Sequence, residues 1–162
     1  MGRVVCATRG GEGSRAAQEW ATRYARENDR PLTFIYIVDF KTLDAFDDSL
    51  LSAVRGELNW LGNSLLRIAR NRAGHSGVTA EIVIREGDVR LTIEDFLRES
   101  AAEILFLGAP RGTTANVFGD DAIEEFAHRI QEDTGIQVEI AHPESLQPLR
   151  ESSERQAVNG EQ

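Results

Sequence analysis

Short apolar runs constrain the fold of this chain more than any other feature. Residues 32–38 read LTFIYIV, an uncharged run rich in β-branched and aromatic side chains. Such a run predicts a strand that is covered on both faces, as in a parallel sheet. Similar runs occupy residues 4–7, 78–84, 104–108 and 136–140, and a helical pattern follows each of the first four runs. This alternation predicts a single-domain α/β fold, a doubly wound and mostly parallel five-stranded sheet with helices on both faces.

The segments between the runs have the spacing of amphipathic helices. The longest carries apolar residues alternately three and four positions apart, at Leu51, Val54, Leu58, Leu61, Leu65 and Ile68. Ser14 and Asp88 are the expected N-caps of the first and third helices, and Gly135 is the expected C′ residue of the last. Residues 85–88 (REGD) are predicted to form a turn before the third helix, which is expected to run through Ala102.

The last run differs from the others because its residues alternate. In residues 136–140 (IQVEI), Ile136, Val138 and Ile140 are separated by polar residues. Alternation is typical of a strand with one exposed face, so we expect this strand at an edge of the sheet. An edge offers unpaired backbone groups to a partner, and we therefore expect a homodimer through residues 136–140.

Composition and charge limit the class of protein. The chain of 162 residues suffices for one domain with a core, which we assign to residues 1–141. The polar stretch at residues 142–162 is expected to be a disordered tail. A net charge of −9 argues against nucleic acids or anionic membranes as partners. No apolar stretch approaches the roughly 18 residues of a membrane span, so we expect a cytoplasmic protein without direct membrane insertion.

Reactive side chains are few and scattered. Cys6, the only cysteine, lies in an apolar run and is expected to behave as a small buried hydrophobe. His75, His128 and His142 lack the spacing of metal ligands, so no metal site is expected. No nucleophile has a base at a suitable spacing, so no catalytic residue is expected.

A glycine-rich turn at residues 9–14 (RGGEGS) follows the first strand. A Walker loop would require Gly-Lys where Arg15 stands. The dinucleotide fingerprint G-x-G-x-x-G would require a third glycine where Ala16 stands. The turn also partly resembles the Ser-Gly-Gly-x-Asp-Ser loop of ATP pyrophosphatases, from which Arg9 and Gly13 depart. None of these phosphate loops is complete.

Three stretches, taken in order, resemble the universal stress protein family. Residues 4–21 (VVCATRGGEGSRAAQEWA) are similar to the opening strand, turn and helix of the family. Residues 85–89 (REGDV) resemble its Gly-x-Pro turn before the third helix, and residues 104–130 resemble the strand, glycine loop and helix of its nucleotide site. The resemblance spans residues 4–140 and implies the strand order 3-2-1-4-5.

The resemblance also implies a motif after the fourth strand, from which this chain departs. Nucleotide-binding members carry Gly-x-x-Gly, nine residues and then Gly-Ser or Gly-Thr. Gly108 holds the first position, but Arg111 stands at the second and Gly112 follows one residue late. Gly119 holds the third position after a shorter loop, and Asp120 replaces the hydroxyl residue. A side chain at the second position hinders backbone contacts with phosphate, and the carboxylate repels phosphate.

At the first loop, the resemblance implies a site that includes Thr8, Arg9 and Gly10. Arg9 stands where nucleotide-binding members have an Asp that contacts the nucleoside, and Val38 matches the apolar position beside the adenine. Arg9 and Arg111 would face the same crevice, where two guanidinium groups can hold a phosphate or a carboxylate.

These observations lead to three hypotheses about function. The first is a dimeric, non-enzymatic regulatory domain of the stress response, without ordinary ATP binding and without a cofactor. The alternative is a module that binds an adenine nucleotide (ATP or AMP) or a small anion through Arg9 and Arg111. The third is a slow ATPase. An unidentified protein partner is compatible with all three.

Overall fold

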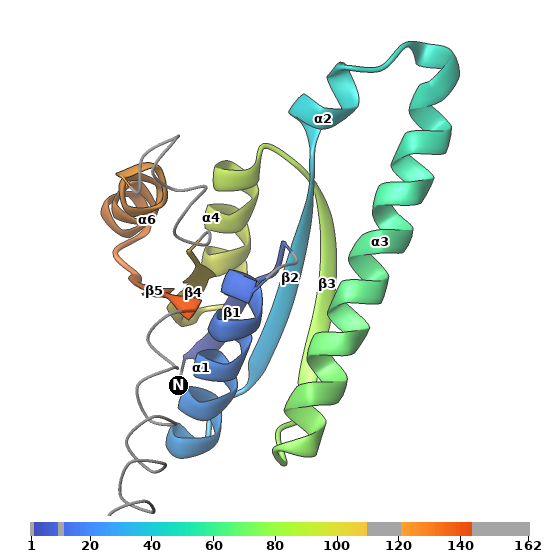
Figure 1. The fold of residues 1–162 in the computed structure, drawn as a ribbon. Helices are drawn as coiled ribbons and strands as arrows, with labels where there is room; N and C mark the ends of the chain where they lie inside the picture. Colours follow the sequence, from blue (N-terminus) through green and yellow to red (C-terminus); the bar gives the residue numbers. More distant parts are fainter. Residues whose placement is uncertain (1, 10–11, 110–120, 144–162) are drawn as a thin grey trace, which may run out of the picture.

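The computed structural model describes residues 2–9, 12–109 and 121–143, and its strands form one five-stranded sheet (Figure 1). The strand order is β3-β2-β1-β4-β5, and each neighbouring pair is parallel. The strands are β1 (Arg3–Ala7), β2 (Leu32–Asp39), β3 (Ala80–Gly87), β4 (Ala102–Gly108) and β5 (Gln137–Ala141). The helices are α1 (Glu12–Asn28), α2 (Phe40–Asp44), α3 (Asp48–His75), α4 (Val89–Glu99) and α6 (Asp121–Thr134). The predicted fold class and strand order are confirmed, and β5 lies at an edge.

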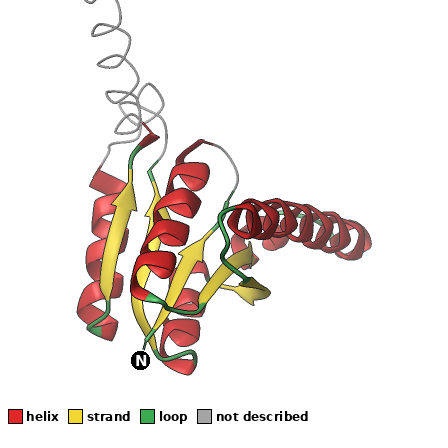
Figure 2. Cartoon of the chain, turned by 90° about the horizontal axis from the view of Figure 1, so that it is seen from below, coloured by secondary structure: helices red, strands yellow, loops and turns green. Residues whose placement is uncertain are grey.

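Helices cover both faces of the sheet and enclose two hydrophobic cores (Figure 2). α1 and α3 pack on one face, and α4 and α6 pack on the other. Neighbouring residues of one strand enter different cores, as Cys6 and Val5 of β1 do, because side chains alternate along a strand. The uncharged runs in the sequence follow from this double coverage.

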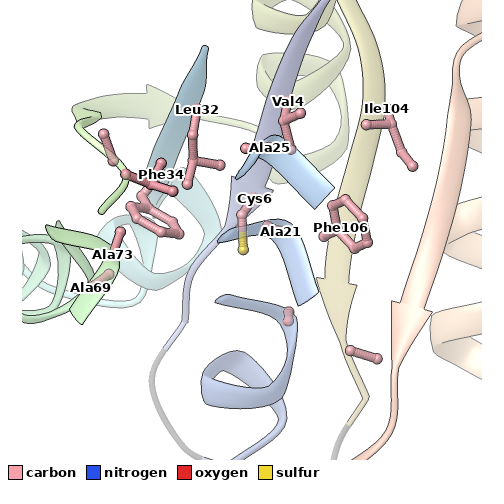
Figure 3. Packing of buried hydrophobic residues seen from close by; sticks show 14 of the residues in the cluster. Val4, Cys6, Ala21, Ala25, Leu32, Phe34, Ala69, Ala73, Ile104 and Phe106 are labelled. Carbon is pink, nitrogen blue, oxygen red and sulfur yellow. The ribbon is translucent and has the colours of Figure 1, made fainter. Parts of the chain in front are cut away.

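Small side chains let α1 and α3 approach the sheet closely (Figure 3). Ala21 and Ala25 of α1 and Ala69 and Ala73 of α3 are all buried among the large side chains of the strands, such as Phe34. An alanine brings the helix axis nearer to the sheet than a leucine would. The helices therefore contribute small residues to this core and the strands contribute the large ones.

Several boundaries differ from the sequence prediction, and two of the differences have a clear cause. β3 continues through residues 85–87, which were predicted as a turn, because β2 is long enough to pair with it as far as Asp39 opposite Gly87. α4 ends at Glu99 rather than at Ala102, because Ala101 takes a φ of 52°, which an α-helix does not allow.

Two of the predicted caps are confirmed. The Asp88 side chain accepts a hydrogen bond from the Leu91 backbone N–H at 3.0 Å and begins α4. Gly135 has a φ of 71° directly after α6, as a C′ glycine should. Ser14 is not a cap, because α1 already begins at Glu12 and Ser14 lies inside its first turn.

α3 presents two apolar surfaces. Its inner face (Gly62, Leu66, Ala69 and Ala73) is buried against β2 and β3. The heptad-spaced residues found in the sequence, here called the α3 seam, lie beside this inner face (Leu51, Val54, Leu58, Leu61, Leu65 and Ile68). Leu61 is 42% exposed and Ile68 is 48% exposed, and the other four seam residues are half-buried. The helix is confirmed, but its most regular apolar stripe is not the one that faces the sheet.

Candidate functional site: a pocket at the carboxyl ends of the strands

A pocket of about 200 Å³ lies at the carboxyl ends of β1, β2 and β4. The loops after parallel strands gather at this edge of a doubly wound sheet, and the strand order reverses between the neighbours β1 and β4. The walls come from residues 7–9 at the end of β1, residues 35–39 of β2 and residues 107–108 of β4, with one or two residues from each helix. The volume is below the roughly 300–1,000 Å³ of typical small-molecule sites. The described part of the pocket thus suits a ring or a sugar better than a whole nucleotide.

Thr8 is fixed in the pocket wall by three neighbours. It is buried, and its backbone N–H donates to the Ile35 carbonyl at 2.8 Å. The Gln18 side-chain Nε2 donates to the Thr8 hydroxyl oxygen at 3.2 Å. The Thr8 side chain also forms a hydrogen bond with the Cys6 thiol, which acts to lower the pKa of that thiol.

Arg9 lies at the pocket wall with its side chain exposed. Its backbone N–H donates to the Ser14 hydroxyl oxygen at 3.0 Å, and Ser14 is itself buried. This bond links Arg9, which follows β1, to the first turn of α1. The Ser14 side chain therefore holds Arg9 and does not cap the helix. The Arg9 guanidinium has no ion pair among the described residues and is available to an anion.

Gly108 allows β4 to touch α1. A Cβ atom built at Gly108 would overlap the carbonyl of Gly13, and one built at Gly13 would overlap the Ala109 carbonyl oxygen. The two glycines therefore bring the end of β4 and the first turn of α1 into direct backbone contact. Gly108 also lines the pocket, so the same residue serves the fold and borders the site.

The remaining walls are mostly apolar, with one carboxylate. Val38, predicted beside the adenine, is buried and lines the pocket. Phe126 of α6 and Val89 of α4 close the other side. Asp39 also lines the pocket, and its carboxylate accepts a hydrogen bond from the Lys41 backbone N–H at 3.0 Å. The predicted site did not include Val89, Phe126 or Asp39. Asp39 could have been found from the sequence, because it is the charged residue that directly follows the apolar run at residues 32–38.

The structure brings together Thr8, Arg9, Val38 and Gly108 as the resemblance implies. The other predicted site residues lie outside the described residues: Gly10, Arg111, Gly112, Gly119 and Asp120. The predicted approach of Arg9 and Arg111 therefore stays a prediction.

Two groups with clearly shifted pKa values lie away from the pocket. Burial raises the pKa of the Cys6 thiol to about 12. Burial also raises the pKa of Glu94, and its hydrogen bond with Asp133 adds to the shift, although the nearby Arg90 acts in the opposite direction. Arg90 bonds Glu94 at 3.0 Å and Asp133 at 2.9 Å, which ties α4 to α6. Neither Cys6 nor Glu94 supplies the pocket with an acid or a base.

The described ranges contain neither a cluster of metal-binding side chains nor a membrane-spanning helix. No group of three or more His, Cys, Asp or Glu side chains there could hold a metal ion. No helix among the same residues is long and apolar enough to cross a membrane.

Comparisons with known proteins agree on the fold. Residues 1–142 match the model of the Universal stress protein family. The universal stress protein UspA from Lactobacillus plantarum superposes with a TM-score of 0.70 at 16% identity, over 86% of this chain and 97% of that one. A family protein from Arabidopsis thaliana with AMP bound gives 0.62 at 16% identity, over 88% and 92%.

A universal stress protein from Archaeoglobus fulgidus in complex with dAMP gives a TM-score of 0.60 at 15% identity, over 85% of this chain and 95% of that one. A comparison with curated protein sequences gave no match. The structural likenesses establish the fold, and the family model matches most of the chain. This protein therefore belongs to the universal stress protein family.

Proposed function

We propose that this chain is a non-enzymatic regulatory domain of the stress response that does not bind ATP in the usual way of its family. The observation that carries the proposal is the pocket itself. Its described walls are mostly apolar, and Arg9 and Asp39 are the charged residues among them, beside the hydroxyl groups of Thr8, Ser14, Tyr36 and Thr42. The sequence adds Arg111 and Asp120 at two positions where nucleotide-binding members contact phosphate.

A second candidate function is the binding of a smaller adenine nucleotide or anion. It is favoured by the Arg9 guanidinium, which is unpaired among the described residues and lies beside apolar walls that include Val38. A base would pack against those walls, and a single phosphate could pair with Arg9. Asp39 could accept hydrogen bonds from ribose hydroxyls. The AMP complex of the Arabidopsis relative supports AMP as the nucleotide to test first.

Calorimetric titration of the purified chain with ATP, AMP and inorganic phosphate separates these functions. The regulatory proposal expects no heat from ATP at low-micromolar concentration and no turnover above a matched blank. The binding alternative expects AMP to bind and Arg9→Ala to weaken that binding about tenfold, as the loss of one charge-assisted contact predicts. Arg15→Ala is the matched control, because Arg15 is exposed on α1 outside the pocket. Tight ATP binding or steady ATP hydrolysis would overturn the first proposal.

We also propose that the domain forms a homodimer through β5. This strand lies at the sheet edge, as expected. One of its backbone donors is already occupied, because the Val138 N–H bonds the Gln131 side-chain oxygen at 3.3 Å. Val138→Pro removes that donor without removing a bond to β4, and it should abolish a dimer built on this edge. An unchanged dimer mass in this variant would exclude pairing through β5.

A further inference from the structure

The α3 seam has the repeat of a coiled coil. Leu51, Leu58 and Leu65 are seven residues apart, and Val54, Leu61 and Ile68 repeat with the same period. These two sets occupy the a and d positions of a heptad, the pattern by which two helices pack along a shared line. α3 is also the longest helix of the described chain, with 28 residues. A helix of this length spans about 42 Å.

Only part of the seam is covered within the chain: Leu58 lines the pocket described above, whereas Leu61 and Ile68 are exposed. The inner face of α3 already packs on β2 and β3, and the seam lies to one side of it. Figures 1 and 2 show α3 beside the edge strand β3, at the outside of the molecule. No described element covers Leu61 or Ile68, and Leu50, beside the first seam residue Leu51, is 53% exposed. A regular apolar stripe of this length is unusual on an exposed surface.

Charges at the two ends of α3 indicate what covers the seam. The next a and d positions beyond it are Asp47 at the amino end and Arg72 at the carboxyl end. Both side chains are exposed, and neither forms an ion pair among the described residues. Parallel helices would bring like charges together at both ends. Antiparallel helices would pair each Asp47 with an Arg72.

We propose that the α3 seam binds the α3 seam of a second copy of this chain, with the two helices antiparallel. The two-fold axis passes between Asn59 and Trp60, so that Leu58 of one protomer packs against Leu61 of its partner. The same register aligns Leu51 with Ile68 and Asp47 with Arg72. The apolar stripe supplies the binding energy, and the terminal charges select the orientation.

This interface is distinct from a dimer through β5. β5 is the last strand at one edge of the sheet, and α3 lies beside β3 at the opposite edge. The two surfaces can thus be occupied together and altered separately.

The test measures the mass of the intact chain by analytical ultracentrifugation from low-micromolar to millimolar protein. Leu61→Glu places a charge in the centre of the seam and should weaken self-association through α3 at least a hundredfold. Trp60→Glu is the matched control: Trp60 is 68% exposed and lies about 100° around the helix from Leu61, away from the seam. In the Val138→Pro background, the chain should still form a dimer, and adding Leu61→Glu should make it a monomer.

A charge exchange tests the orientation. Asp47→Arg and Arg72→Asp should each weaken the dimer about tenfold, because each variant juxtaposes like charges twice in the symmetric pair. The double variant should restore the original affinity. Proper folding of every variant is checked by its urea unfolding midpoint.

Three results would overturn the proposal. One is a Val138→Pro chain that is monomeric at every concentration, because the seam would then not bind a second copy. Another is a dimer of the Val138→Pro chain that Leu61→Glu does not weaken. A charge exchange that fails to restore the dimer would exclude the antiparallel register.

Discussion

The two apolar surfaces of α3 differ in the size and the exposure of their side chains. The inner face is lined mainly by small residues (Gly62, Ala69 and Ala73), with Leu66 as its only large side chain, and it is buried. The seam is made of leucines, a valine and an isoleucine, and part of it is exposed. The comparison shows that α3 lies close to the sheet because the residues of its inner face are small. Large apolar residues with perfect heptad spacing remain available for another helix.

The most direct test of this comparison is to shorten one large residue on each surface and compare the losses of stability. Leu66→Ala should destabilise the chain by about 2–5 kcal/mol, because Leu66 is fully buried and its loss leaves a cavity. Ile68→Ala should cost less than about 1 kcal/mol in dilute protein, because Ile68 is half exposed. Urea unfolding of both variants at the same low concentration measures the difference. Equal losses of free energy would mean that the seam is packed as tightly as the inner face.

A second test adds volume to the inner face. A Cβ atom at Gly62 would collide with the Tyr36 ring of β2, so Gly62→Ala should destabilise by about 1–3 kcal/mol despite the better helix propensity of alanine. The same variant should shift the near-ultraviolet circular dichroism of Tyr36. An increase in stability would show that β2 and α3 are not in close contact at this point.

A third test uses the core under the inner face, where Cys6 is buried with Ala69 and Ala73. Burial raises the pKa of Cys6 from its ordinary 9.0 to about 12, so the unfolded chain loses this proton first as the pH rises. Stability should therefore be complete below pH 9.0 and fall above it by at most about 1.4 kcal/mol per pH unit. Urea unfolding from pH 8 to pH 10 should show this loss in the native sequence and not in Cys6→Ala. The same slope in both chains would assign the effect to other groups.

The smallest expected effect lies on the outward side of the same helix. Beyond the neighbouring backbone of α3 itself, no atom of the described residues lies within 4 Å of a Cβ built at Gly56, so Gly56→Ala should stabilise the chain by about 0.5–1 kcal/mol through helix propensity alone. Thermal unfolding measures the gain. Destabilisation here would indicate that an element outside the described residues packs against this part of α3.

The strands could be predicted because apolar runs of this length have few other places in a packed fold, and the strand order was implied by the resemblance to the family. α2 could not be predicted, because it is five residues long and has no apolar period. The inner face of α3 was also missed, because glycine and alanine carry little periodic signal while the leucines of the seam carry a strong one. Helix burial depends on the shape of the sheet beneath, which the sequence of the helix does not contain.

The candidate site was predicted unevenly for a similar reason. Thr8, Arg9, Val38 and Gly108 follow or end strands, and topology alone brings the ends of parallel strands together. Val89 and Phe126 belong to helices on the far side of the pocket, and their place in its wall depends on how α4 and α6 pack. The ion pair between Arg90 and Asp133 joins these two helices, and its sequence separation of 43 residues leaves no local pattern.

The backbone contact between Gly108 and Gly13 changes how a sequence signature should be weighed. A glycine in a nucleotide motif is usually scored as a mark of ligand binding. At Gly108 the fold itself excludes every larger residue, with or without a ligand in the pocket. A relative that no longer bound a nucleotide would therefore still need glycine at this position. A glycine here indicates the fold and gives no information about nucleotide binding. The motif positions that can distinguish nucleotide-binding members from the others are those where the fold accepts more than one residue type.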